Sequence, residues 1–365
     1  MRSATAASAR CSPSHGSSGA SPAGCGRRGA CPSSRRRLVA ERRVGEGAPR
    51  RVSVVMATYR REELLRAALE DVLALKYPEL EIIVVDQTPE HTPATRALLA
   101  SVADHVRLIH QARPHVVTAL NAGLAAARGE IVLFLDDDIR ITDPDFVGAH
   151  AKNYDDPRVG GVAGRVIDAR TRAEGRYDAR SADPVFGFFH TSWNHRTRAT
   201  VYSAPGANMS FRREALVRLG GFDERFVGNA FRFENDLVLR LSRAGYVVVF
   251  DPEPEVLHFY GSPGGSENRH LLGRDRASHA WYVAFFHNQV YCDLKHTPRR
   301  YLPGRCWRLY RSHVLNRPYL VEGAGFVLHR HAAFVRGVSG AVATYARLPR
   351  AERYAVEASS TRLRR

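Results

Sequence analysis

Three adjacent aspartates, Asp136, Asp137 and Asp138, come directly after the apolar stretch IVLFL. Neighbouring carboxylates repel one another, so such a run is costly at the edge of a core unless a cation neutralises it. Hard divalent ions prefer oxygen ligands and commonly bind one or two carboxylates together with a diphosphate. A solvated acidic turn is the alternative interpretation. The position directly after a buried strand favours a site for Mg²⁺ or Mn²⁺.

Four further polar residues stand at positions from which they could bind a ligand or take part in catalysis. Asp86 follows the apolar stretch EIIVV, and an acid at such a strand end commonly hydrogen-bonds a base or ribose, although it can also simply form a turn. Glu234 and Asp236 stand just ahead of LVLRLSRAGY, where they either cap a helix or provide a general base for an acceptor hydroxyl. His258 is a candidate metal ligand, with a polar structural anchor as the alternative.

The elements that must position these residues alternate between strands and helices. β-Branched apolar runs predict buried strands, and apolar residues at helical spacing predict helices between them. This alternation predicts an α/β domain with a mostly parallel central sheet and flanking helices, in which ligands bind beyond the carboxyl ends of the strands. The predicted strands are 52–56, 81–85, 106–109 and 131–135, and the predicted helices are 62–75 and 116–127.

The pattern is more mixed in the second half of the chain. Strands are expected at 160–168 and 246–252, and helices at 214–219, 235–244 and 274–294. Residues 301–348 combine apolar residues and Arg without a clean period. Three regions follow from this: a disordered basic tail at 1–50, an α/β domain at 51–262, and a helical, basic C-terminal region at 263–365.

The charge of the 365-residue chain is concentrated at its ends. The formal net charge is +17, but residues 1–50 carry ten Arg against two Glu, and residues 296–365 carry fourteen Arg against three Glu. Residues 51–295 therefore sum to −2, which argues against a basic groove for nucleic acid and fits tails that contact an anionic membrane surface. No apolar run approaches the ~18 residues that span a bilayer. The five Cys show no disulfide or zinc spacing.

Six segments in order resemble the family 2 glycosyltransferases. They are VSVVMATYRR, EIIVVDQT, LNAGLAAARGEIVLFLDDDI, GANMSFRREALVRLGGFDERF, FENDLVLRLSRAGY and DPEPEVLHF, and together they cover about residues 51–260. The resemblance implies the GT-A fold of nucleotide-diphospho-sugar transferases, with residues 51–262 as the catalytic domain. It also implies an inverting hexosyl- or deoxyhexosyltransferase that depends on Mg²⁺ or Mn²⁺.

The same resemblance implies roles for individual residues. It places Thr58, Tyr59, Arg60, Asp86, Asn121, Asp136 and Asp137 at the nucleotide, places Asp136, Asp138 and His258 at the metal, and makes Glu234 and Asp236 the candidate bases. The chain departs from the family at two positions: Leu120 stands where Arg is frequent, and Phe233 with Glu234 stands where Glu with Asp is frequent. The base therefore stays open between Glu234 and Asp236, with Glu234 favoured.

The expected partners are a nucleotide-sugar donor, a glycan or lipid-linked acceptor of cell-envelope synthesis, and an anionic membrane, but no nucleic acid. The expected location is the cytoplasm, with peripheral contact at the inner face of the plasma membrane. A sugar-phosphate nucleotidyltransferase is one rival, although the Gly-rich loop it needs is absent after the first strand. A non-enzymatic membrane- or RNA-binding protein that uses the basic tails is the other.

Overall fold

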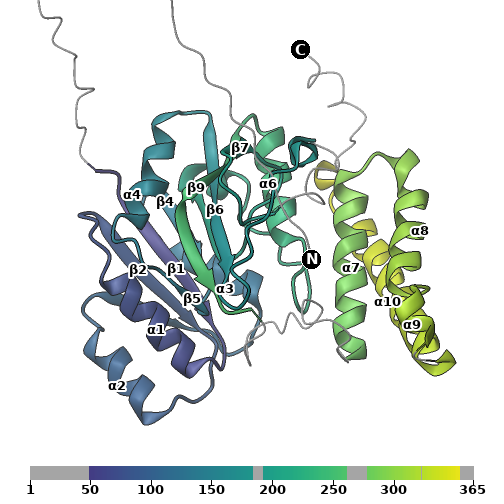
Figure 1. Cartoon of the computed structure of the whole chain (residues 1–365), viewed down its shortest axis with the longest axis horizontal. Helices are drawn as coiled ribbons and strands as arrows, with labels where there is room; N and C mark the ends of the chain where they lie inside the picture. The colour runs from purple at the N-terminus through teal and green to yellow at the C-terminus, as the bar shows by residue number, and fades with distance from the viewer. Residues whose placement is uncertain (1–48, 184–191, 261–277, 322, 354–365) are drawn as a thin grey trace, which may run out of the picture. The chain divides into compact units, whose positions relative to one another are not determined.

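A computed structural model describes residues 49–183, 192–260, 278–321 and 323–353 (Figure 1). They belong to one compact unit that runs from Ala48 to Arg365. Nearly all of the predicted basic tail, and the predicted boundary at 262/263, lie outside the described residues. The proposed division into domains therefore stays a prediction.

Nine strands of the described residues form one sheet, in the order β3-β2-β1-β4-β8-β6-β9-β5, with β7 paired to β9. The strands are β1 (Val52–Thr58), β2 (Leu80–Asp86), β3 (Val106–His110), β4 (Ile131–Leu135), β5 (Ile139–Arg140), β6 (Val159–Asp168), β7 (Ala199–Thr200), β8 (Asn208–Arg212) and β9 (Val247–His258). The helices are α1 (Glu62–Leu73), α2 (Pro93–Ser101), α3 (Val116–Ala126), α4 (Phe146–Ala151), α5 (Arg213–Arg218), α6 (Phe233–Arg243), α7 (His279–His296), α8 (Leu302–His313), α9 (Arg317–Val321) and α10 (Ala324–Ala346).

Alternating side chains of the central strands build a core on each face of the sheet. In β1, Val54 and Met56 belong to the core that contains the apolar face of α1. Val55 points the opposite way, into the core that contains α3, α5 and α6. Gly123 of α3 allows a close approach there, because a Cβ at this position would lie 2.2 Å from Val55 Cγ1. Helices thus cover both faces, and the strand ends are left for the site.

The sheet is mixed rather than mostly parallel. The pairs β1–β2, β2–β3, β1–β4 and β6–β9 are parallel. The pairs β4–β8, β6–β8, β5–β9 and β7–β9 are antiparallel. The difference arises from β8, which was not predicted as a strand: it enters the sheet between β4 and β6 and runs against both. The predicted α/β architecture with flanking helices and a helical C-terminal region is confirmed.

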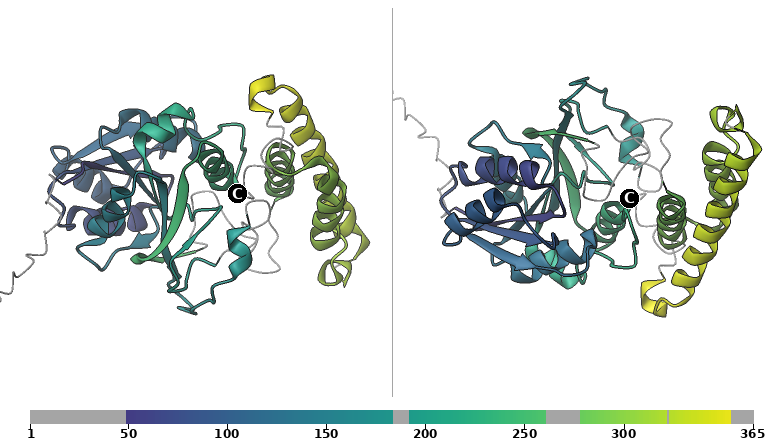
Figure 2. Two further views of the ribbon diagram at one scale, coloured as in Figure 1. Left: turned by 90° about the horizontal axis from the view of Figure 1, so that it is seen from above. Right: turned by 90° about the horizontal axis from the view of Figure 1, so that it is seen from below.

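The C-terminal region contributes its own small core. Helix α10 lies alongside α7, and α8 also packs on α7 (Figure 2). Aromatic residues of α7, including Trp281, Phe285 and Phe286, meet Val314 and Ala333 there. Among the described residues, every helix is too short or too polar to cross a bilayer.

Candidate active site

A pocket of about 400 Å³ opens at the carboxyl ends of β1 and β4. Because β1 and β4 are parallel neighbours, with Met56 opposite Leu135, the residues that follow each strand reach the same edge of the sheet. The first turn of α7 contributes to the opposite wall. The lining residues are Ala57, Thr58, Tyr59, Arg61, Gln87, Pro114, His115, Val116, Asp136, Asp137, Asp138, Gly228, Asn229, His258, Tyr260, Ser278, Ala280, Trp281 and Ala284.

The three aspartates occupy different environments in this pocket. Asp137 is buried, accepting a hydrogen bond from Thr58 Oγ1 at 2.7 Å and one from Arg61 Nη1 at 2.8 Å. The same Nη1 lies 2.8 Å from Asp138 Oδ2. Burial raises the pKa of Asp137 to about 6. The side chain of Asp136 is 42% exposed and faces the open pocket.

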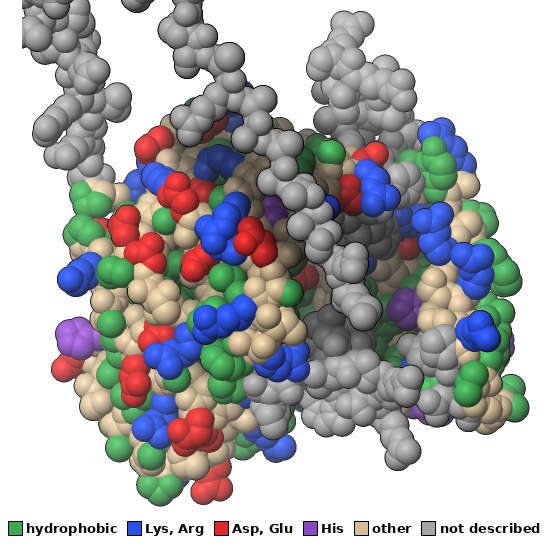
Figure 3. Space-filling model, in the orientation of Figure 1, with side chains coloured by type: hydrophobic (Ala, Val, Ile, Leu, Met, Phe, Trp, Pro, Cys, Tyr) green, Lys and Arg blue, Asp and Glu red, His purple; other side chains and the backbone are tan. Residues whose placement is uncertain are grey.

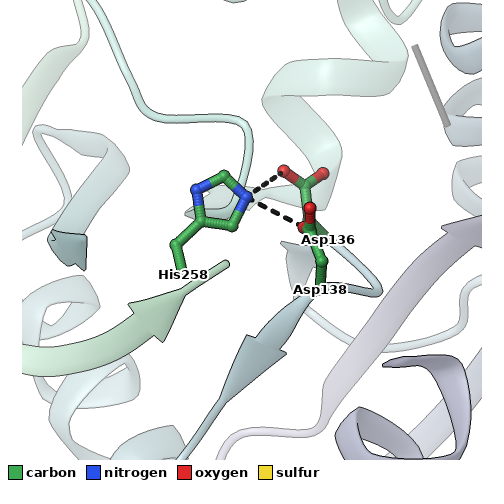
Figure 4. A group of neighbouring side chains, drawn as sticks. All are labelled: Asp136, Asp138 and His258. Atoms are coloured by element: carbon green, nitrogen blue, oxygen red, sulfur yellow. Dashed lines mark hydrogen bonds and ion pairs between the residues drawn. The ribbon is translucent and has the colours of Figure 1, made fainter. Parts of the chain in front are cut away.

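His258 reaches the aspartates through strand pairing. In the antiparallel pair β5–β9, His258 lies opposite Ile139, and Phe259 N donates to Asp138 O at 2.9 Å. The imidazole Nε2 then lies 2.8 Å from Asp138 Oδ1 and 3.6 Å from Asp136 Oδ2 (Figure 4). Burial opposes the charged imidazole, but the hydrogen bond and charge of Asp138 still raise the pKa of His258.

These three side chains fit a divalent cation. Asp136, Asp138 and His258 each offer one ligand atom, and these atoms all lie within 4.8 Å of one another. Partial burial, followed by the negative charge of Asp138, raises the pKa of Asp136, so the two carboxylates repel each other and a cation would relieve that repulsion. Two carboxylates and an imidazole, with one side open to the pocket, are donors that suit an ion which also binds phosphate oxygens.

Glu234 lies in the first turn of α6, two residues after the left-handed backbone of Arg232 at φ 80°. The helix begins earlier than predicted, so Glu234 stands inside its first turn. Gly206 leaves room beside it, because a Cβ there would lie 3.0 Å from Glu234 Oε1. Burial raises the pKa of Glu234 to about 8, and the charge of Asp136 adds to the shift. This carboxylate is therefore poised to take up a proton near neutral pH.

Neither candidate base is among the residues that line the pocket, and Asp236 is enclosed by the fold. It is wholly buried and accepts hydrogen bonds from Arg240 Nε at 2.8 Å and His296 Nε2 at 2.7 Å. Lys295 Nζ lies 2.5 Å from its Oδ1. Burial opposes ionisation, but Arg240 and Lys295 hold the pKa of Asp236 well below its usual range. A carboxylate that is surrounded by fixed cations joins α6 to α7 and is badly placed to accept a substrate proton.

Three residues expected at the nucleotide have other roles in the fold. Asn121 fixes the turn after α5, donating to Phe222 O at 2.9 Å and accepting from Phe222 N at 2.9 Å. Asp86 is the buried last residue of β2, and Thr88 N and His91 Nε2 donate to its two oxygens. The exposed Arg60 extends over the ring of Tyr59, outside the pocket lining.

Several lining residues were not predicted from the sequence. Arg60 was expected at the nucleotide, but its neighbour Arg61, which directly precedes α1, lines the pocket instead. Gln87 follows Asp86 and accepts a hydrogen bond from His115 N at 2.5 Å. Asn229 and Trp281 are far away in sequence and lack any local motif, so only the folded chain brings them to the pocket.

An α/β sheet with a carboxylate–imidazole cluster at its strand ends is the arrangement expected of an enzyme that binds a nucleotide together with a divalent ion. Residues 53–220 match the family model described as glycosyl transferase family 2. This segment thus resembles the family 2 glycosyltransferases, as the motifs predicted, and the observed sheet with helices on both faces agrees with that resemblance.

Characterised relatives resemble parts of the chain. The O-antigen biosynthesis protein RfbC of Myxococcus xanthus is 31% identical over 58% of this chain and 17% of its own length. An N-acetylglucosaminyl-diphospho-decaprenol L-rhamnosyltransferase of Mycobacterium tuberculosis is 36% identical over 32% of this chain and 35% of its own length. The mannosyltransferase PcManGT of Pyrobaculum calidifontis, solved with GDP-Man and Mn²⁺, aligns with 86% of this chain and 80% of its own length, at 22% identity and a TM-score of 0.49. Among the first curated relatives, the chain spans between 17% and 49% of their lengths.

Proposed function

We propose that this chain transfers a hexosyl or deoxyhexosyl group from a nucleotide-sugar donor to a hydroxyl of a glycan or lipid-linked acceptor in cell-envelope synthesis. The observation that carries the proposal is the Asp136–Asp138–His258 cluster at a pocket of nucleotide size, with Glu234 close enough for the charge of Asp136 to raise its pKa. The O-antigen and rhamnosyltransferase relatives support an envelope acceptor.

In the proposed reaction, Glu234 accepts the proton of the acceptor hydroxyl. The oxygen of that hydroxyl attacks the anomeric carbon of the donor sugar. The bond from that carbon to the diphosphate breaks on the opposite face, and the anomeric configuration inverts. A divalent ion at the cluster would supply positive charge for the leaving diphosphate. Arg61 holds Asp137 and Asp138 in place, and Thr58 donates a hydrogen bond to Asp137 Oδ2.

We further propose that the ion is Mn²⁺ rather than Mg²⁺. One of the three donors is the imidazole of His258, and Mg²⁺ binds almost entirely through oxygen. Nitrogen donors suit transition-metal ions better. Mn²⁺ accepts the mixed set while still binding phosphate oxygens.

The C-terminal helices favour peripheral contact with an anionic membrane at its cytoplasmic face. Residues 299–321 and 323–353 contain eleven Arg and a single acid. On α8 the 58% exposed Trp307 stands beside the exposed Arg308 and Arg311, and blue and green side chains intermingle over these helices in Figure 3. Aromatic rings settle at the headgroup level while guanidinium groups pair with lipid phosphates.

The proposed activity is tested by incubating the chain with UDP-, GDP- and dTDP-activated sugars and Mn²⁺. Release of a nucleoside diphosphate and a rise in Tm with that diphosphate plus Mn²⁺ would support it. Transfer to a polyprenyl-diphosphate sugar, followed by NMR of the new linkage, then tests for inversion. If no nucleotide raises the Tm and no donor is consumed, the proposed function is wrong.

A further inference from the structure

The loop between α5 and α6 contains an unusual stretch of backbone directly before Glu234. Gly228, Ala230 and Arg232 have φ values of 57°, 50° and 80°. Left-handed backbone at a residue other than glycine costs about 1 kcal/mol or more and persists only where the surroundings enforce it. Such strain is concentrated at functional sites. The fold therefore keeps this loop in a conformation that costs free energy.

Helix α7 packs directly against this loop and enforces its shape. Asn288 is fully buried, accepts a hydrogen bond from Val227 N at 2.9 Å and donates to Val227 O at 2.8 Å. Gly228 permits close contact, because a Cβ there would lie 2.8 Å from Ala284 Cβ. The loop is thus fixed to the helix through both the N–H and the C=O of Val227.

Asn229 is the polar residue that this arrangement presents to the pocket. Its Oδ1 accepts hydrogen bonds from Phe231 N and from Asn288 Nδ2, each at 3.2 Å. These two bonds fix the orientation of the amide, so Nδ2 is the remaining donor. Nδ2 is buried and finds no partner among the described residues, although Asn229 lines the pocket and is only 9% exposed. An unsatisfied buried amide costs roughly 1–3 kcal/mol, which a bound oxygen atom would recover.

We propose that Asn229 is a substrate-recognition residue whose side-chain amide donates a hydrogen bond to a hydroxyl group of a sugar bound in the pocket. The inference rests on the proposed function, since it assumes that the pocket binds a sugar. The sugar belongs either to the donor or to the acceptor; both present the same hydroxyl chemistry. The strained loop leads directly into the first turn of α6, so recognition by Asn229 and the position of Glu234 are coupled through a short length of backbone.

Two substitutions separate recognition from loop shape. Asn229→Ala removes the whole amide. Asn229→Ser removes the N–H donors but keeps a short oxygen that accepts from the backbone N–H two residues later. In both variants we expect the KM of one substrate to rise about tenfold, with kcat and the Kd of the nucleoside diphosphate plus Mn²⁺ unchanged. A rise in the donor KM assigns the hydroxyl to the donor sugar, and a rise in the acceptor KM assigns it to the acceptor.

Asn153→Ser serves as the matched control. Asn153 is a buried Asn outside the pocket lining, and its Nδ2 already donates to Ala149 O and Asp251 Oδ2, each at 2.9 Å. This variant should lower the Tm and leave both KM values unchanged. If Asn229→Ser changes neither KM, or lowers kcat alone, Asn229 only shapes the loop and the inference is overturned. A wild-type chain that consumes no nucleotide sugar would instead refute the proposed function.

Discussion

Glu234 is a residue at which catalysis and stability should oppose each other. Its carboxylate is partly buried beside Asp136, and burial raises its pKa to about 8. Such a pKa suits a general base that works near neutral pH. The same shift means that ionised Glu234 costs folding free energy, because the group ionises more readily in the unfolded chain.

Glu234→Gln should therefore lower kcat by roughly 10²–10⁴-fold while nucleotide binding is kept. In the wild type, turnover should fall as the pH drops below about 8. The residual turnover of the variant should not show this decrease. The stability that protonated Glu234 contributes is complete below its ordinary pKa and is lost as the pH rises through about 8. The variant should thus gain Tm relative to the wild type at alkaline pH and not at acid pH. Equal pH profiles of turnover would contradict the assignment.

The metal cluster is tested through Asp138, which contacts both His258 and Arg61. Asp138→Asn removes one anionic ligand and should raise the Mn²⁺ concentration needed for half-maximal turnover by at least ~tenfold. Asp104→Asn, on the exposed surface, is the control and should leave that concentration unchanged. Unaltered Mn²⁺ dependence in Asp138→Asn would show that the ion binds elsewhere.

At the scale of the elements, the buried ionic cluster around Asp236 joins α6 to α7. Lys295 lies 2.7 Å from Asp223 and 2.5 Å from Asp236, so it connects the turn before α6, α6 itself and α7. Arg243 donates to His296 Nδ1, which leaves His296 Nε2 as the donor to Asp236. The cluster therefore fixes the helix that carries Glu234 against the helix that closes the pocket.

Asp236→Asn should destabilise the fold by about 3–5 kcal/mol, because it leaves several buried cations without their shared anion. Urea unfolding measures this loss. In the fraction that stays folded, turnover should exceed that of Glu234→Gln, since the base is still present. A stable, inactive Asp236→Asn together with an active Glu234→Gln would reverse the assignment of the base.

For the whole molecule, the separation of charge suggests how the enzyme reaches its acceptor. The basic, partly apolar surface of α8 and α10 belongs to the same compact unit as the pocket. On α10, the exposed Leu328, Val335 and Val342 recur every seven residues and so share one face. Such a surface would hold the enzyme at an anionic bilayer in which a lipid-linked acceptor is embedded.

Arg308→Glu should weaken binding to vesicles that contain anionic phosphatidylglycerol by at least ~fivefold in a sedimentation assay, because each charge near the surface contributes about 1 kcal/mol. Arg158→Glu changes charge equally at an exposed position outside the C-terminal helices and should bind as the wild type does. Equal loss in both variants would mean that only net charge matters, and no loss in either would exclude this surface.

The sequence predicted those parts of the fold that local pattern encodes. Short β-branched apolar runs mark the buried strands, and apolar residues about every 3.6 positions mark the helices, so β1, α1, β2, β4 and α3 were located within a few residues. Helix α10 was missed because its small residues and Arg give no clear period, and β8 was missed because five residues before a helix look like a loop.

By itself, the sequence determined the family, the alternation of strands and helices, and the acids at the end of β4, because these depend on neighbours in the chain. Only the tertiary structure decided which polar residues meet. Pairing of β5 with β9 brings His258 to Asp138 across 120 positions, and α7 brings Asn288 to Asn229 across 59. It also separated Glu234, whose pKa is raised by the charge of Asp136, from Asp236, which is buried among cations. Two residues on one turn of a helix point in different directions, and the surrounding packing, which no local pattern records, decides which of them meets the substrate.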